Sequence, residues 1–214
     1  MARSDADFVA AGLALVKERG FEALTSRNLG EAMGVHSTAI YRHFPQWDLL
    51  VMSVADALFG ELVSQGGPEI AAIADPRERI VAIFAGLRAQ VRAQPDLADN
   101  LLRIAAAPVS VSTPNLDVIV RVVIASLQQM GMTGPALITA YQALEDLAVG
   151  SLGSSFAGHP RHLENRLGRR RMVGVGEVTA QVQTEADVDR INDAAVLFAV
   201  NAVLDACERV VANG

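Results

Sequence analysis

Cysteine is almost missing from the sequence, since Cys207 is the one such residue among 214. A single thiol excludes an internal disulfide and is typical of proteins kept in a reducing compartment. Aromatic residues are also scarce, at 5%, whereas hydrophobic residues reach 51% and alanine recurs throughout. Runs of alternating β-branched and aromatic residues, which strands favour, are hard to find. The composition therefore predicts an all-α fold of closely packed helices.

Signals for export or membrane insertion are also lacking. The first residues, MARSDADF, include acids and lack the apolar core of a secretory signal. The longest charge-free run, Val122 to Leu144, is interrupted by glycine, proline and glutamine. A membrane span needs about 20 mainly apolar residues. We therefore expect a cytoplasmic protein.

Basic residues are few compared with what nucleic-acid-binding proteins usually contain. The formal net charge is -6, and residues 1–59 contain five basic side chains against seven acidic ones. Affinity for DNA depends on local positive charge meeting phosphates and not on the total. For a DNA-binding role we expect modest non-specific affinity and a shallow salt dependence.

No group of residues has the composition of a catalytic or metal site. His159 and His162 could be completed only by Glu164, which leaves too few ligands for a metal. The Gly174-Val175-Gly176 pattern has no strand before it and no helix after it, which argues against nucleotide binding. Cys207 lies in an apolar stretch and is expected to be a buried structural thiol. We therefore predict no enzymatic activity, no metal and no cofactor.

The spacing of apolar residues and of Gly and Pro divides the chain into helices. Gly66, Gly67 and Pro68 predict a break after the fourth helix, and residues 159–184 predict a long irregular connection. The last helix is apolar nearly all round, which indicates burial on both sides, most simply against a second copy of the chain. The expected helices are 5–19, 25–33, 37–44, 47–65, 75–94, 95–107, 115–130, 135–155 and 186–212.

The segment Thr25 to Phe44 has the pattern of a helix-turn-helix. Thr25 is a suitable N-cap, and Gly34 falls where the chain must turn sharply. The predicted core faces are formed by Leu29, Ala32 and Met33 on the first helix and by Ile40 and Phe44 on the second. The outer face of the second helix carries Ser37, Thr38, Tyr41 and Arg42. These polar groups recur at i, i+1, i+4 and i+5, so they share one side of a helix, where they form a surface suited to a DNA groove.

Residues 8–59 resemble the DNA-binding domain of the tetracycline repressor (TetR) family of bacterial regulators. The resemblance rests on GFEALTSRNLGEAMGV at Gly20–Val35 and AIYRHFPQWDLL at Ala39–Leu50. A weaker resemblance, at Asp75–Ile80, Ser112–Asp117 and Gln128–Gly131, extends to the tetracycline-repressor type of C-terminal domain. The family implies a DNA-binding domain at 1–60 and an effector-binding and dimerisation domain at 61–214.

The resemblance also implies roles for individual residues. Bases would be read by Ser37, Thr38 and Arg42. Ser26 and Arg27 would together touch phosphate and a base edge, and phosphates would also be contacted by Tyr41, His43 and Gln46. Alternatively, Tyr41 and His43 pack at the edge of the small core. His36 stands where the family usually has serine, and Trp47 stands where a lysine commonly reaches a phosphate, so a charge is lost there.

The implied partners are operator DNA, a second copy of the chain and a small effector. The dimer would form through the helices at about 135–155 and 186–212. The effector would be mostly apolar, because Ile, Leu, Val, Ala and Phe dominate the region between Asp75 and Ser155. Candidate polar anchors for it are Arg88, Asn100, Arg103, Gln142, Glu145 and Asp146.

The expected function is a ligand-released repressor that binds a pseudo-palindromic operator as a homodimer. The alternative is a helical small-molecule-binding protein with weak or partner-dependent DNA binding, which the acidic N-terminal region and Trp47 suggest. An enzyme is a third class, and nothing in the residues favours it.

Overall fold

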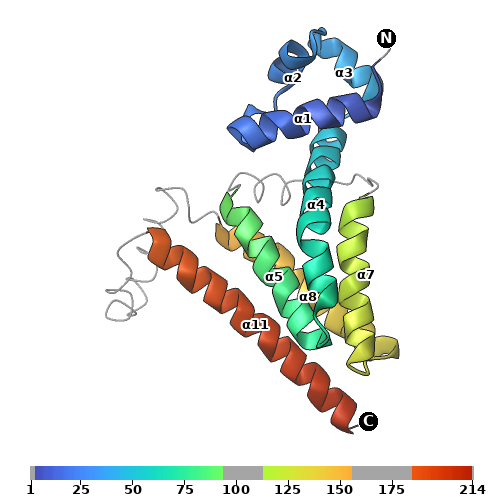
Figure 1. Ribbon diagram of the computed structural model, residues 1–214, viewed down its shortest axis with the longest axis vertical. Coiled ribbons are helices and arrows are strands. Elements are labelled where there is room, and N and C mark those ends of the chain that lie inside the picture. The colour runs from blue at the N-terminus through green and yellow to red at the C-terminus, as the bar shows by residue number, and fades with distance from the viewer. Residues whose placement is uncertain (1–2, 94–112, 156–184, 214) are drawn as a thin grey trace. The chain divides into compact units, whose positions relative to one another are not determined.

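The computed structural model describes residues 3–93, 113–155 and 185–213, and all regular structure within these ranges is helical (Figure 1). The all-α prediction is therefore confirmed. The predicted helix at 95–107 and the connection at 159–184 lie outside the described residues. The helices are α1 (Asp5–Arg19), a 3-10 turn η1 (Phe21–Ala23), α2 (Ser26–Met33), α3 (Ser37–His43), α4 (Trp47–Ala72), α5 (Pro76–Ala93), α7 (Pro114–Gln129), α8 (Gly134–Ser155) and α11 (Glu185–Asn213).

The chain forms two compact units. Among the described residues, one unit contains 3–74 and 113–123, and the other contains 75–93, 124–155 and 185–213. Helix α7 begins in the first unit and ends in the second. A compact unit is not by itself a functional domain, so the division into 1–60 and 61–214 stays a prediction.

Helix α1 anchors the first unit. Ser4 and Asp7 form a capping box, in which the Ser4 N–H donates to Asp7 Oδ2 at 2.8 Å and the Asp7 N–H donates to Ser4 Oγ at 3.3 Å. The hydrogen bonds from the Ser4 backbone and hydroxyl hold the pKa of Asp7 below its ordinary value. Gly12 lets α1 approach α4 closely, because a Cβ there would lie 2.7 Å from Val54 Cγ2.

The small core of the first unit is apolar and drawn from every helix of the N-terminal segment. Its buried side chains include Phe8, Leu15, Val16, Phe21, Leu24, Leu29, Met33, Ile40, Phe44, Leu50, Val51, Val54, Leu58 and Phe59. One predicted core residue, Ala32, is exposed. That expectation was wrong because the face of α2 that packs inward is narrow and consists of Leu29, Gly30 and Met33.

The predicted break at Gly66–Pro68 was also wrong. Helix α4 continues to Ala72 with Pro68 inside it, and the parts Trp47–Glu61 and Val63–Ala72 meet at an angle of 46°. Pro68 has no N–H to donate to the carbonyl four residues earlier, yet the helix continues past it. The bend lies between Glu61 and Val63, before the Gly66–Pro68 segment. Within the described ranges, no single helix is long and apolar enough to cross a membrane; the two bent parts of α4 reach that length and hydropathy only together.

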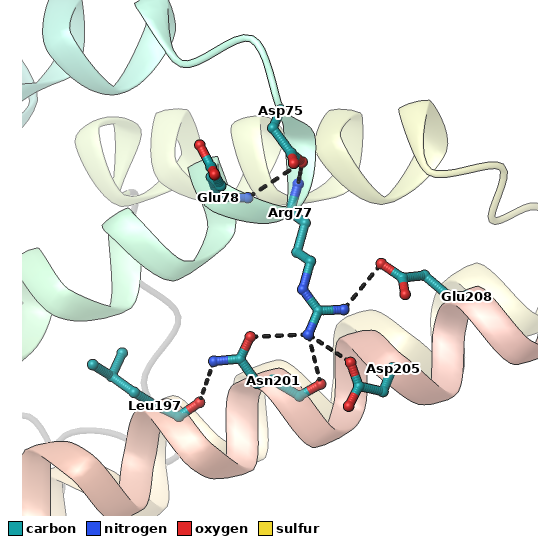
Figure 2. A network of polar contacts seen from close by, with 7 residues as sticks. All are labelled: Asp75, Arg77, Glu78, Leu197, Asn201, Asp205 and Glu208. Atoms are coloured by element: carbon teal, nitrogen blue, oxygen red, sulfur yellow. Dashed lines mark hydrogen bonds and ion pairs between the residues drawn. The ribbon is translucent and has the colours of Figure 1, made fainter.

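The second unit packs α5 and α8 against α11. Asp75 caps α5 by accepting from the N–H of Arg77 at 2.8 Å and from that of Glu78 at 3.4 Å. Figure 2 shows Arg77 reaching α11, where its guanidinium donates to Asn201, Asp205 and Glu208. Burial lowers the pKa of Arg77, but the bonds and negative charges of the two carboxylates outweigh it and raise the pKa. The start of α5 is thereby fastened to the last turns of α11.

Buried polar groups distinguish the middle of this unit. Arg88 is only 2% exposed and donates through Nε to Asp193 Oδ1 of α11 and through Nη1 to the Ser151 carbonyl of α8, both at 2.9 Å. Arg92 pairs with the other oxygen of Asp193. Cys207 is buried, as predicted, and burial raises the pKa of its thiol.

Candidate nucleic-acid interface

The turn between α2 and α3 has the geometry expected of a helix-turn-helix. The Thr25 hydroxyl caps α2 by accepting from the Asn28 N–H at 3.1 Å, and Gly34 ends it in the left-handed region at φ 65°. Gly30 was not singled out in the sequence, yet a Cβ there would lie 2.8 Å from the Val35 carbonyl oxygen. Two glycines therefore set the close crossing of the helices.

Helix α3 presents its predicted polar face outward. Ile40 is fully buried beneath it, whereas Thr38, Tyr41 and Arg42 are exposed and Ser37 is half-buried. Neither Tyr41 nor Arg42 has a polar partner among the described residues, so a phenol and a guanidinium stand unengaged on the surface. The outer face of α3 therefore offers several base-reading side chain types together.

The predicted contacts on α2 are also accessible. Ser26 is half-buried at the first position of the helix, and Arg27 is exposed. Arg27 Nε donates to Glu31 Oε1 at 3.0 Å, an ion pair between residues one turn apart. Glu31 therefore partly neutralises a cation that phosphate would otherwise attract.

His43 and Gln46 flank the end of α3. His43 Nδ1 lies 2.7 Å from Asp5 Oδ1, and its ring is 4.7 Å from that of Phe8, so it packs against α1 as the alternative interpretation held. Gln46 is exposed and precedes α4, and its side chain does not cap that helix. Trp47 is half-buried. Phosphate contact by His43 or Gln46 stays a prediction.

Two residues near this surface had no firm role in the sequence. Arg3 donates through Nη2 to the Met33 carbonyl at 2.8 Å and so ties the N-terminal residues to the end of α2. His36 is the N-cap of α3 and accepts from the Thr38 N–H at 3.4 Å through Nδ1. Histidine is an unusual cap, since Ser, Thr, Asp and Asn are the preferred residues at this position.

The candidate effector anchors are not gathered at one place. Arg88 is occupied by Asp193 and Ser151. Gln142, Glu145 and Asp146 are exposed on α8, where Gln142 donates to Asp146 and Glu145 accepts from Tyr141. Asn100 and Arg103 lie outside the described residues, as do His159, His162 and the arginine run. The assignment of these residues to a ligand stays a prediction. Among the described residues, no three His, Cys, Asp or Glu side chains could hold a metal ion.

Residues 8–50 match the family model "Bacterial regulatory proteins, tetR family". No curated protein matches the chain by sequence. The fold is similar to a possible TetR family transcriptional regulator from Streptomyces coelicolor A3(2), at 24% identity and a TM-score of 0.71, covering 97% of this chain and 100% of that one.

Two further solved structures have the same fold. A putative transcriptional regulator from the same organism has 19% identity and a TM-score of 0.71, with 98% of this chain and 99% of that chain covered. A TetR variant from Acinetobacter baumannii AYE, in complex with minocycline, has 22% identity and a TM-score of 0.62, with 98% of each chain covered. The likeness in fold thus extends beyond residues 8–50 to nearly the whole chain.

Proposed function

Since residues 8–50 carry the N-terminal domain of the tetR family and the chain has the fold of TetR-family transcriptional regulators, we propose that it binds operator DNA as a homodimer and is released by a small, mostly apolar effector. The observation that carries this proposal is the exposed face of α3, held outward by a buried Ile40 and a Gly34 turn. Ser37, Thr38 and Arg42 would read base edges in the major groove, and Tyr41 would contact phosphate.

Replacing Arg42 with alanine should weaken operator binding by about 1–3 kcal/mol, because its guanidinium can donate two hydrogen bonds to a guanine edge. The measurement is a titration of full-length protein with operator duplex recovered from the DNA upstream of its own gene. The matched control is Arg19→Ala, which removes an exposed arginine at the end of α1. If Arg42→Ala binds the operator duplex as tightly as the unchanged protein does, Arg42 does not read a base.

The homodimer is supported by apolar side chains left uncovered on two adjacent helices of the second unit. Soluble chains scatter single exposed apolar residues, but large ones rarely gather on neighbouring helices without a partner surface. Phe198 is 78% exposed on α11 and Ile138 is 68% exposed on α8. The further exposed members are Val149, Ile191, Val210 and Val211. A two-fold axis would pair this surface with itself.

Effector release requires that α4 respond to the effector-binding helices. Asp56 of α4 is buried and accepts from the N–H of Leu116 at 3.0 Å and from the side chain of Asn115 at 2.9 Å, at the start of α7. A Cβ on Gly60 would lie 2.9 Å from the Asn115 side chain, so the contact is close. Because α7 continues into the second unit, we propose that a shift of α7 on effector binding is passed through Asp56 to α4 and the DNA-binding helices.

The second candidate, a ligand-binding protein with weak DNA affinity, is favoured by the Arg27–Glu31 ion pair and the acidic excess of the N-terminal segment. A gel shift with the upstream DNA that shows no specific complex at micromolar protein would support this second candidate.

Replacing Glu31 with glutamine should strengthen binding to non-specific duplex, because it removes a negative charge and frees Arg27 for phosphate. An exposed pair of this kind contributes about 0–1 kcal/mol to stability, so folding should be nearly unchanged. One added phosphate contact makes the slope of log affinity against log salt steeper by about 0.9. The control is Glu22→Gln, an exposed glutamate on η1; equal slopes for the two variants would show that Arg27 does not face DNA.

A further inference from the structure

His36 and Thr38 form a short-range pair at the start of α3, on the surface proposed to face DNA. His36 Nδ1 lies 2.9 Å from Thr38 Oγ1 and 3.4 Å from the Thr38 backbone nitrogen. Both residues are exposed, so the pair is accessible to a groove. The resemblance would place serine at position 36, and serine has no ring nitrogen with which to form this pair.

The backbone contact determines which atom is the donor and which is the acceptor in each contact of this pair. A backbone N–H can only donate, and that of Thr38 points at Nδ1. A hydrogen on Nδ1 would face the amide hydrogen, so Nδ1 carries its lone pair and the ring proton lies on Nε2. The Thr38 hydroxyl, at 2.9 Å from the same nitrogen, must then be the donor in its contact.

A hydroxyl whose hydrogen is committed in this way has only acceptor lone pairs left. Thr38 is otherwise able to serve as donor or acceptor, which makes threonine a poor discriminator of bases. In the major groove, adenine offers an amino donor at N6 and cytosine one at N4, whereas guanine and thymine present acceptors at O6 and O4. An acceptor-only Thr38 is compatible with the first two and is repelled by the last two.

We infer that His36 is a specificity-determining residue: by holding the Thr38 hydroxyl hydrogen, it makes Thr38 select adenine or cytosine over guanine or thymine at one position of each half-site. The inference rests on the proposed DNA-binding function. Thr38 then complements Arg42, whose guanidinium can only donate and therefore favours guanine. The Nε2–H of His36 is left to donate outward, where a phosphate oxygen would be a suitable acceptor.

Selection from random DNA duplexes by the full-length protein tests this inference, with sequencing of the bound pool. For the unchanged protein we expect one position in each half-site to favour A or C over G or T by about three- to tenfold, the range of a single net hydrogen bond. His36→Ser keeps a hydroxyl cap on α3 but releases the Thr38 hydroxyl, so this preference should disappear from the enriched motif while the preferences at the other positions of the half-site stay. Thr38→Val should abolish the same preference, and Thr38→Ser should keep it.

The outcomes separate the inference from the function on which it rests. If the unchanged protein enriches no symmetric motif, the proposed function fails. If a motif is enriched and His36→Ser leaves the A or C preference intact, the inference alone is overturned. If His36→Ser loses helical circular dichroism, the comparison of Thr38→Val with Thr38→Ser decides: the same base preference in both variants would overturn the inference.

Discussion

Replacing Phe198 with aspartate should convert the proposed homodimer into a monomer. The Phe198 ring is 78% exposed in the single chain, and its burial at a two-fold interface would occur twice. Burying a phenylalanine side chain stabilises an interface by about 1.5–3 kcal/mol, so the two copies would contribute about 3–6 kcal/mol to the dimer. The variant loses this contribution, and burying two carboxylates in the same place would destabilise the dimer further. Light scattering at micromolar protein should give twice 22.7 kDa for the unchanged chain and 22.7 kDa for the variant.

The control for this change is Ala10→Asp, which adds the same charge at an exposed position of α1. It should leave the mass at the dimer value. A Phe198→Asp protein that still scatters as a dimer, with its helicity intact, would place the interface elsewhere. An unchanged chain that scatters only at 22.7 kDa would refute the homodimer itself.

Replacing Asp193 with alanine should destabilise the fold by about 3–5 kcal/mol, because it leaves the Arg88 guanidinium buried without its carboxylate. Arg88 is 2% exposed and Asp193 is 22% exposed, so solvent screens the pair weakly. The measurement is the free energy of unfolding from urea titration, followed by far-ultraviolet circular dichroism.

Asp205→Ala is the matched control on the same helix. Asp205 also pairs with an arginine, Arg77, but its side chain is 51% exposed, and Glu208 and Asn201 remain to bind that guanidinium. We expect a loss of at most about 1 kcal/mol for this change. Equal losses for the two variants would mean that burial does not set the strength of the Arg88–Asp193 pair.

Much of the first unit was predictable because its determinants are close in sequence. The bounds of α1 follow from Ser4, Asp7 and Gly20, which cap it within one turn of each end. The turn at Gly34 and the outer face of α3 follow from glycine geometry and helical spacing. The Arg88–Asp193 pair joins residues 105 apart, and no local pattern marks either as the partner of the other.

At the N-terminal surface, a contact between residues only two positions apart also could not be predicted from the sequence. His36 and Thr38 were both noted in the sequence, one as a departure from the usual serine and the other as a base-reading residue. Their joint role depends on the direction of the imidazole ring, which is set by the backbone at the start of α3. Residue type alone could not show that the His36 ring accepts a hydrogen bond from the Thr38 hydroxyl.

The sequence by itself thus determined the helical class, the helix-turn-helix at Thr25–Phe44 and the polar face Ser37, Thr38, Tyr41 and Arg42, because helix periodicity, caps and turns act over a few residues. Only the tertiary structure decided that α4 continues through its Gly-Gly-Pro segment, that Arg88 is buried and that His43 packs against Asp5 and Phe8. These outcomes depend on which surfaces meet, since packing can outweigh a helix-breaking residue and burial can turn a charge that would be solvated into a structural contact.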